Sequence, residues 1–300
     1  MNLLLVSIDS LRLDYVSRTN SRIATPNFDA LTRDFCFYQG LFSASTATRP
    51  VHTSLFTGLY PFEHGVLGQT SKAMRSDIPT LFDLLQNNGT KVSAFSEAPE
   101  IFTGLSYADF IQRYAAGAVS QTLAAQAAEQ RFVFLHFWGA HTPYGAADGA
   151  ALGETAQLLR SGQQHVVQER YARAVEQLFE QQLAALLSTL DLRNWCVFIF
   201  SDHGESWTAE EPYHGCTLRN SVLRVPFYYH IPGTGNPLPA RPVLSLIDLF
   251  PTLLHLFQVE SDYRGLGTDM RWNAAPQYRF AQIHPDPKPL DLPSTPDDHL

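Results

Sequence analysis

The hydrophobic pattern of the chain consists of short apolar runs separated by segments with helical spacing. The runs cover residues 3–8, 92–95, 132–137, 196–200 and 224–229. Runs of this length without regular polar alternation are typical of parallel strands that are buried on both faces. Helical spacing of apolar side chains occurs between and after them, at residues 79–88, 168–190 and 246–257. Strands that alternate with helices predict an α/β fold with a mostly parallel central sheet sandwiched between helices.

Two segments in the last quarter of the chain lack this apolar pattern. Residues 233–242 are rich in Gly and Pro, which predicts a surface loop. Residues 284–300 carry no regularly spaced apolar side chains, which predicts a flexible tail. The simplest organisation is therefore one catalytic domain over residues 1–283 with a short C-terminal part, because 300 residues can form one large core.

Composition narrows the partners that the chain can have. A net charge of −8 argues against a general nucleic-acid binder, since phosphate backbones require basic stripes. The three cysteines are too few and too scattered for a disulfide framework. The apolar run at the N-terminus ends at Ile8 without the organisation of a signal peptide, and no stretch approaches the ~20 apolar residues of a membrane span. We expect a cytoplasmic protein without nucleic-acid or membrane partners.

Acidic and imidazole side chains follow two of the predicted strands. Asp9 comes directly after the first strand, and Asp202 and His203 come just after the strand at 196–200. Ligands of such sheets gather beyond the carboxyl ends of the strands. Two carboxylates and one imidazole there suit one divalent cation. The alternative is that each aspartate only caps the helix that follows it.

Residues 48–66 carry a more specific pattern. They read TRPVHTSLFTGLYP followed by EHGV after one residue, with Gly58 ten positions after Thr48 and Pro50 two positions after it. This resembles the signature of the sulfatase family in the alkaline phosphatase superfamily, in which a nucleophile begins a helix. Further blocks follow the order of that family: IDSLRLD at 8, IPTL at 78, HFWGAHTPY at 136, SDHGE at 201, HG at 214, RVP at 224 and IDLFPTL at 247.

The resemblance implies an alkaline phosphatase-like or sulfatase-like fold and a metal-dependent reaction. By this resemblance, Asp9, Asp202 and His203 would be ligands of the metal. The Thr48 hydroxyl would be the nucleophile and a fourth metal ligand. One divalent cation is expected, Mn²⁺, Zn²⁺, Mg²⁺ or Ca²⁺, since no Asp with a His four residues later lies between 141 and 202, as relatives with two metals have. A cation beside a hydroxyl favours its ionised, nucleophilic form.

Other positions would contact the ester. The resemblance implies that His141 and His214 contact its oxygens or protonate the leaving group, in catalytic roles. His52 stands where the motif usually has Arg, Arg49 could help to hold an anion, and Gln69 lies where relatives often keep a polar contact. These three are the expected substrate-binding residues. The walls of the substrate pocket would come from loops 97–117 and 145–163. The residues of these loops show no pattern that identifies the leaving group of the ester.

Departures from the usual motif bear on the substrate. Thr48 cannot form the aldehyde of a matured sulfatase, because its β-carbon carries a methyl group and oxidation would stop at a ketone. Together with His52 in place of Arg and Ser10 in place of a second Asp, this favours phosphate or phosphonate esters over sulfate esters. A second register makes Ser45, thirteen residues before Gly58, the matured nucleophile of a true sulfatase.

The sequence thus predicts a hydrolase of small anionic esters that acts through a covalent intermediate on Thr48. A transferase of the same superfamily and a non-catalytic binding protein on the same fold stay open, as does the Ser45 sulfatase. A homo-oligomer could complete a site left open by the short C-terminal part. Two histidines are interpreted as structural: His64 as a hydrogen bonder near the nucleophile helix, and His136 as a core residue within an apolar run.

Overall fold

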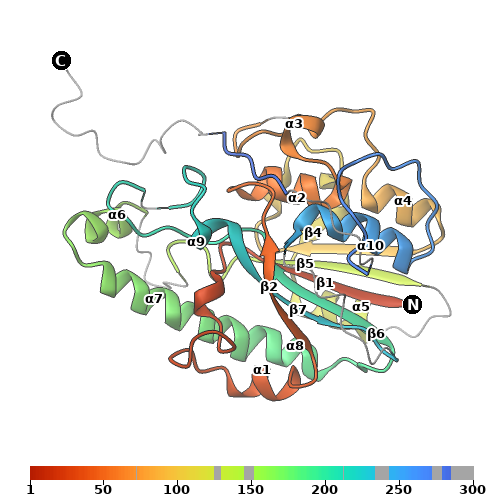
Figure 1. The fold of residues 1–300 in the computed structure, drawn as a ribbon. Coiled ribbons are helices and arrows are strands. Elements are labelled where there is room, and N and C mark those ends of the chain that lie inside the picture. The colour runs from red at the N-terminus through yellow and green to blue at the C-terminus, as the bar shows by residue number, and fades with distance from the viewer. Residues whose placement is uncertain are drawn as a thin grey trace.

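The structure, a computed structural model, describes residues 1–71, 73–124, 130–144, 152–211, 213–233, 243–271 and 279–284. Among them runs one eight-stranded sheet in the order β4-β3-β5-β1-β6-β7-β2-β8 (Figure 1). The parallel part contains β1 (Asn2–Ile8), β3 (Lys91–Ser96), β4 (Ile111–Arg113), β5 (Arg131–Phe137) and β6 (Trp195–Ser201). The predicted loop at 233–242 and tail at 284–300 lie outside the described residues, apart from their first positions.

The apolar pattern misses the short β4 at one edge of the sheet, and β2 (Cys36–Phe42) and β8 (Leu244–Ser245) at the other edge, but it predicts β7 (Arg224–His230). Strand β7 runs antiparallel to β6 and to β2, and the short β8 is parallel to β2. The sequence did not predict β2, because most of its side chains are only half-buried and its pairing with β7 is irregular between Tyr38 and Leu41. The predicted mostly parallel α/β sheet is nevertheless confirmed.

Helices cover both faces of the sheet (Figure 1). One face carries α2 (Thr48–Thr57), α3 (Pro61–His64), α4 (Leu81–Asn87) and α10 (Leu249–Leu256). The other carries α1 (Pro26–Leu31), α5 (Ala116–Ala124), α7 (Gln164–Gln177) and α8 (Ala184–Ser188). The helix predicted at 168–190 begins earlier than expected and contains a π-helical stretch, Leu178–Leu183, between α7 and α8. Smaller elements are α6 (Leu152–Arg160), α9 (Asn220–Leu223) and the 3-10 helices Leu13–Tyr15, Pro99–Phe102, Ala108–Phe110 and Leu246–Asp248.

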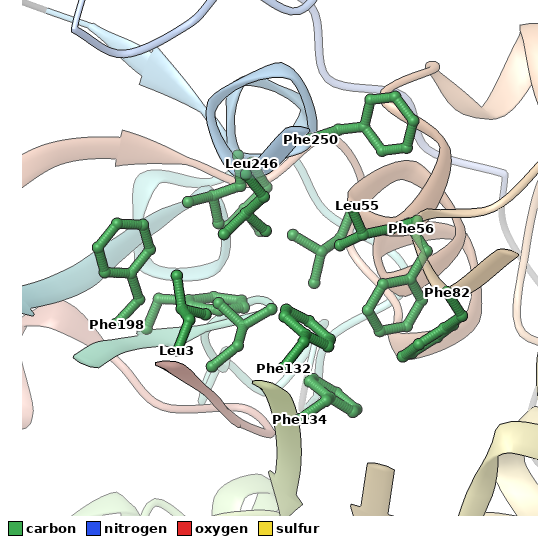
Figure 2. Close-up of a cluster of buried hydrophobic side chains, with 14 of the residues drawn as sticks. Leu3, Leu55, Phe56, Phe82, Phe132, Phe134, Phe198, Leu246 and Phe250 are labelled. Carbon is green, nitrogen blue, oxygen red and sulfur yellow. The ribbon is translucent and has the colours of Figure 1, made fainter. Parts of the chain in front are cut away.

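Alternation along the buried strands divides the core into two layers. In β1, Leu3 and Leu5 pack under α2 and α10, whereas Leu4, Val6 and Ile8 pack against the opposite helices. Figure 2 shows the first layer, in which side chains of the sheet meet those of α2, α4 and α10. Each fully buried large apolar side chain contributes about 1.5–3 kcal/mol. Both faces of β1 are therefore buried in the apolar core as far as Val6.

The α2 face of the sheet becomes polar at the carboxyl ends of its strands. The strand positions that continue the alternation of Leu3, Phe132, Phe198 and Ala94 are Ser7, Asp9, His136, Asp202 and Ser96. All five are fully buried. A polar cluster thus lies beneath the start of α2, at the end of the sheet where α/β proteins bind ligands.

A short C-terminal segment, residues 279–284, is tied to the core near this cluster. The Arg279 guanidinium lies 2.8 Å from the Asp248 carboxylate, and both side chains are almost completely buried. Asp248 also accepts hydrogen bonds from the backbone N–H groups of Ser245 and Thr268. The backbone N–H of Gln282 donates to the carbonyl oxygen of Ala44, in the loop that precedes α2.

We expect Arg279→Met to lower the free energy of unfolding by about 3 kcal/mol, because it leaves the buried Asp248 carboxylate without its counter-ion. Urea denaturation followed by circular dichroism measures this loss. The double variant Asp248→Asn with Arg279→Met should recover part of it, since no uncompensated charge then remains buried. Equal unfolding midpoints for the wild type and Arg279→Met would show that the pair contributes nothing.

Candidate active site

Thr48 begins helix α2 with its hydroxyl directed into the polar cluster. Its Oγ1 donates to Asp9 Oδ2 at 3.0 Å and lies 3.4 Å from His203 Nε2. Pro50 is accommodated in the first turn, where a backbone N–H would have no helical acceptor. The helix ends at Gly58, which has φ 71° and closes it with a left-handed residue. The hydroxyl is buried and is held by the helix start rather than by a loop.

Asp9 and Asp202 face each other from the ends of neighbouring strands β1 and β6. One Asp202 oxygen, Oδ1, accepts the N–H groups of Ser10 at 3.2 Å and His203 at 2.7 Å. The other, Oδ2, is buried and has no hydrogen-bond partner among the described residues. Burial, and then the charge of Asp9, raise the pKa of Asp202 well above its usual value. Burial alone would raise the pKa of Asp9 too, but nearby imidazoles, His141 first, hold it well below the usual range.

His203 completes this group with a defined orientation. Its Nδ1 donates to the carbonyl oxygen of Gly204 at 2.9 Å, so Nε2 of the neutral ring carries a lone pair. That Nε2 lies 3.4 Å from Asp202 Oδ2 and 3.9 Å from Asp9 Oδ1. The ligand atoms that these three side chains offer lie within 4.8 Å of one another. An unpartnered buried carboxylate oxygen beside an imidazole lone pair fits a divalent cation.

His214 and His141 lie above this group. The His214 ring is 4.2 Å from that of His203 and 5.1 Å from that of His141, centroid to centroid. Its Nδ1 is 3.2 Å from Oε1 of the buried Glu205. Burial would lower the pKa of His214, but Glu205 outweighs burial and raises it. His141 stacks on Trp138 at 3.7 Å, and burial lowers its pKa.

The three expected substrate contacts lie around α2 with protein partners. His52 is fully buried, its Nδ1 donates to the Thr48 carbonyl at 2.9 Å, and its Nε2 lies 3.0 Å from Ser7 Oγ. The Arg49 backbone N–H donates to Gln69 Oε1 at 3.1 Å. The Arg49 guanidinium donates to the carbonyl oxygens of Ser71, Ile101 and Thr103. The structure thus brings together the proposed nucleophile, metal ligands and two histidines, and places these three side chains in contacts that support the helix.

Sequence reasoning missed three buried side chains that touch the group. Ser10 Oγ donates to Asp9 Oδ1 at 2.8 Å, and Glu205 contacts His214. His136, interpreted from the sequence as a core histidine, is buried, but its Nε2 lies 3.3 Å from Asp9 Oδ2. Strand parity could have found it, because position 136 continues the face of Phe132 and Phe134.

A cavity of about 850 Å³ lies away from this chemistry, at the other end of α2. It is lined by Thr57, Phe62, Arg75, Phe250 and Tyr263 among others, with acidic and basic side chains mixed. None of its described lining residues belongs to the polar cluster. Of these two places among the described residues, the polar cluster is the candidate active site, because it combines a candidate nucleophile with candidate metal ligands.

The α/β fold and a hydroxyl that begins a helix beside buried carboxylates are the features that the sequence predicts for a hydrolase of ester bonds, and the family matches support this class. The Sulfatase family model matches residues 104–259, just over half of the chain. The chain belongs to the sulfatase family. The model of type I phosphodiesterases and nucleotide pyrophosphatases matches residues 3–147, the part that contains Asp9 and Thr48.

A known protein with a similar sequence is a sulfatase. An ulvan-active sulfatase of Formosa agariphila is 32% identical over 79 residues, which is 26% of this chain and 16% of that protein. The chain thus matches only a small part of the length of this relative.

Among the described residues, no helix is both long enough and apolar enough to cross a membrane.

Solved structures share the fold at low sequence identity. A 2-O GAG sulfatase superposes with a TM-score of 0.70 at 14% identity, covering 89% of this chain and 73% of that one. The phosphonate monoester hydrolase of Agrobacterium radiobacter gives 0.64 at 19% identity, with 93% and 78% covered. The C-terminal periplasmic domain of EptC from Escherichia coli, in complex with Zn, gives 0.67 at 18%, with 97% and 93% covered.

Proposed function

We propose that the chain is a metal-dependent hydrolase of phosphate-type, phosphonate-type or sulfate esters, with phosphorus esters favoured, and that Thr48 is its nucleophile. The observation that carries the proposal is the position of the Thr48 hydroxyl, 3.0 Å from Asp9 Oδ2 and 3.4 Å from His203 Nε2. A buried hydroxyl between a carboxylate and an imidazole, at the start of a helix, is held for attack by its surroundings.

The proposed step transfers the phosphoryl or sulfo group to Thr48. A bond forms between Thr48 Oγ1 and the phosphorus or sulfur atom, and the bond from that atom to the leaving oxygen breaks. The hydroxyl proton is directed at Asp9 Oδ2. His214, which Glu205 orients, donates a proton to the leaving oxygen. In the second step a bond forms between a water oxygen and the phosphorus or sulfur atom while the bond to Thr48 Oγ1 breaks. A proton of that water passes to His214, and the proton on Asp9 returns to Thr48 Oγ1.

One divalent cation would be held by Asp9, Asp202, His203 and the Thr48 hydroxyl. The proposal is supported by the donor set itself, which includes the unpartnered Asp202 Oδ2. When bound, a cation of this kind supplies positive charge beside the nucleophile and the ester oxygens. Members of the superfamily use metal ions, and the EptC domain of similar fold was solved with Zn. The identity of the cation in this chain is an outcome of the experiment below.

Phosphorus esters are favoured on two grounds. The phosphodiesterase model covers the segment with Thr48, and the Thr48 side chain cannot be matured to an aldehyde. The rival nucleophile Ser45 is buried and its Oγ donates to the carbonyl oxygen of Gln282 at 2.8 Å, in the C-terminal segment. That hydrogen bond directs the Ser45 hydroxyl at backbone, so the Thr48 register has the better support.

Transfer to an acceptor other than water is the second candidate function. A neighbour of similar fold from Campylobacter jejuni is named a phosphoethanolamine transferase, and the proposed covalent intermediate could be resolved by an alcohol or amine.

We also propose a small anionic ester as the substrate and the cytoplasm as the compartment, both from the sequence alone. A homo-oligomer that completes the site remains part of the proposal, and light scattering that finds only monomers would remove it.

The test of the proposed function is turnover by metal-loaded protein of para-nitrophenyl phosphate, a bis-aryl phosphodiester, an aryl phosphonate and para-nitrophenyl sulfate. Separate samples are dialysed against Mn²⁺, Zn²⁺, Mg²⁺ and Ca²⁺. We expect turnover of at least one phosphorus ester that disappears with a chelator. Turnover of the sulfate alone would establish the sulfatase alternative. Failure to retain any of the four cations would leave a non-catalytic binding protein as the better account.

We expect His214→Ala to lower kcat by about 100-fold for esters with poor leaving groups, because general acids contribute at least that much. The loss should shrink for aryl esters whose leaving oxygen needs no proton. Since the pKa of His214 is raised, the wild-type rate should fall on the alkaline side as the ring loses its proton, and this limb should be missing in the variant. Equal losses for good and poor leaving groups would assign the proton to another residue.

A further inference from the structure

Ser96, His136 and Asp9 form a hydrogen-bonded row across three neighbouring strands. Ser96 is the register partner of His136 between β3 and β5, and His136 is that of Ser7 between β5 and β1. Asp9 lies two residues beyond Ser7 on the same face of the sheet. The Ser96 Oγ lies 2.8 Å from His136 Nδ1, and His136 Nε2 lies 3.3 Å from Asp9 Oδ2. All three side chains are fully buried.

The direction of these hydrogen bonds follows from the groups at the ends of the row. A carboxylate can only accept, so His136 Nε2 carries the hydrogen that points at Asp9. The Ser96 oxygen accepts the backbone N–H of Ala98 at 3.0 Å, and its own hydrogen is then available to His136 Nδ1. Ser96 thus sets the tautomer of His136, and the tautomer makes His136 a donor to Asp9. This is the arrangement by which residues around a metal site orient its ligands.

The direction of its hydrogen bonds distinguishes His136 from a metal ligand. His52, His136 and Asp202 also lie close enough to resemble a second cation site. However, His52 Nδ1 carries the hydrogen that it donates to the Thr48 carbonyl oxygen, and that is the atom 3.8 Å from Asp202. His136 Nε2 thus turns an N–H toward Asp9, and the hydrogen on His52 Nδ1 is committed to the Thr48 carbonyl oxygen, so neither nitrogen offers a lone pair to a cation. His136 is therefore a donor to Asp9 and His52 a donor to the backbone of α2, which agrees with the proposal of a single cation.

We propose that His136 is a positioning residue that fixes the carboxylate of Asp9 for the cation and for Thr48. The inference rests on the proposed function, in which Asp9 is a metal ligand. Asp9 Oδ2 accepts from both Thr48 and His136, and Oδ1 accepts from Ser10, so three donors fix the plane of the carboxylate. Without the His136 donor, the carboxylate can rotate away from the arrangement that meets the nucleophile. Losses of such donors typically cost 10–100-fold in metal affinity.

The test is the affinity for Mn²⁺, Zn²⁺, Mg²⁺ and Ca²⁺, measured by isothermal titration calorimetry on the metal-stripped chain of 300 residues. We expect His136→Phe to bind the preferred cation about 10–100-fold more weakly than the wild type. Ser96→Ala, which releases the tautomer but keeps the ring, should lose less. His136→Gln, whose amide N–H can reach the position of Nε2, should recover part of the affinity.

His64→Phe is the matched control, because His64 is an equally buried histidine whose ring nitrogens bond to Ser54 and the Val66 backbone. It should lower the melting temperature of the metal-free protein but leave cation affinity unchanged. At saturating cation, His136→Phe should lower kcat while KM changes little. Equal affinities for His136→Phe and the wild type would overturn the inference alone. A wild type that binds none of Mn²⁺, Zn²⁺, Mg²⁺ and Ca²⁺ would overturn the proposed metal site, and this inference with it.

Discussion

Thr48→Ala should abolish turnover, with a loss of about 10⁴-fold or more in kcat, because it removes the proposed nucleophile and one metal-facing oxygen. The Cβ of alanine keeps the first turn of α2, so the fold should be unchanged by circular dichroism. The measurement is the initial rate on whichever ester the wild type hydrolyses fastest. Rapid-quench mass spectrometry of the wild type should also find the phosphoryl or sulfo group on the peptide that contains Thr48.

Two variants control this prediction. Thr48→Ser retains a hydroxyl in the same place, and we expect it to keep activity within about 100-fold of the wild type. Ser45→Ala should keep nearly full activity, because the Ser45 hydroxyl is bonded to the Gln282 carbonyl oxygen rather than to the carboxylates. Turnover that survives Thr48→Ala but is lost in Ser45→Ala would make Ser45 the nucleophile and the chain a matured sulfatase.

Asp202→Asn should have opposite effects on metal binding and on stability. We expect the affinity for the cation to fall by at least about 100-fold, since changes even to residues behind the ligands reach that size. The metal-free protein should become more stable at pH 7, by about 1 kcal/mol or roughly 2 °C in melting temperature. The asparagine can still accept the N–H groups of Ser10 and His203, and its amide can donate to His203 Nε2.

The metal-free protein should gain stability from Asp202→Asn because folding raises the pKa of Asp202. When folding raises the pKa of a carboxyl, the group favours the folded state only while it is protonated. The free energy of unfolding therefore falls as the pH rises from the pKa of Asp202 in the unfolded state through its higher pKa in the folded state. The gain from Asp202→Asn should therefore be present at pH 7 and vanish near pH 4, about the unfolded pKa of an aspartate. Calorimetric melting with a chelator at both pH values measures it, and the exposed Asp191→Asn is the control. Unchanged cation affinity would show that Asp202 is not a ligand.

The sequence by itself determined the class of fold and the family. Continuous apolar runs can be buried only between two layers, so β1, β3, β5, β6 and β7 were predicted from short stretches of sequence. The spacing from Thr48 to Gly58 is a helix-length feature, and α2 begins and ends as that spacing implies. Asp9, Asp202 and His203 follow strand ends, and the carboxyl ends of neighbouring parallel strands meet at one edge of the sheet.

Only the tertiary structure decided which polar side chains share the site. Strand order places β5 beside β1, and this pairing alone brings His136 to Asp9 across 127 positions of the chain. The packing of α2 turns His52 toward Ser7, and the loops at 71 and 101–103 take up the Arg49 guanidinium. These contacts depend on register and on helix rotation, which local sequence leaves open because a buried polar residue has the same spacing whether it faces a ligand or a backbone group.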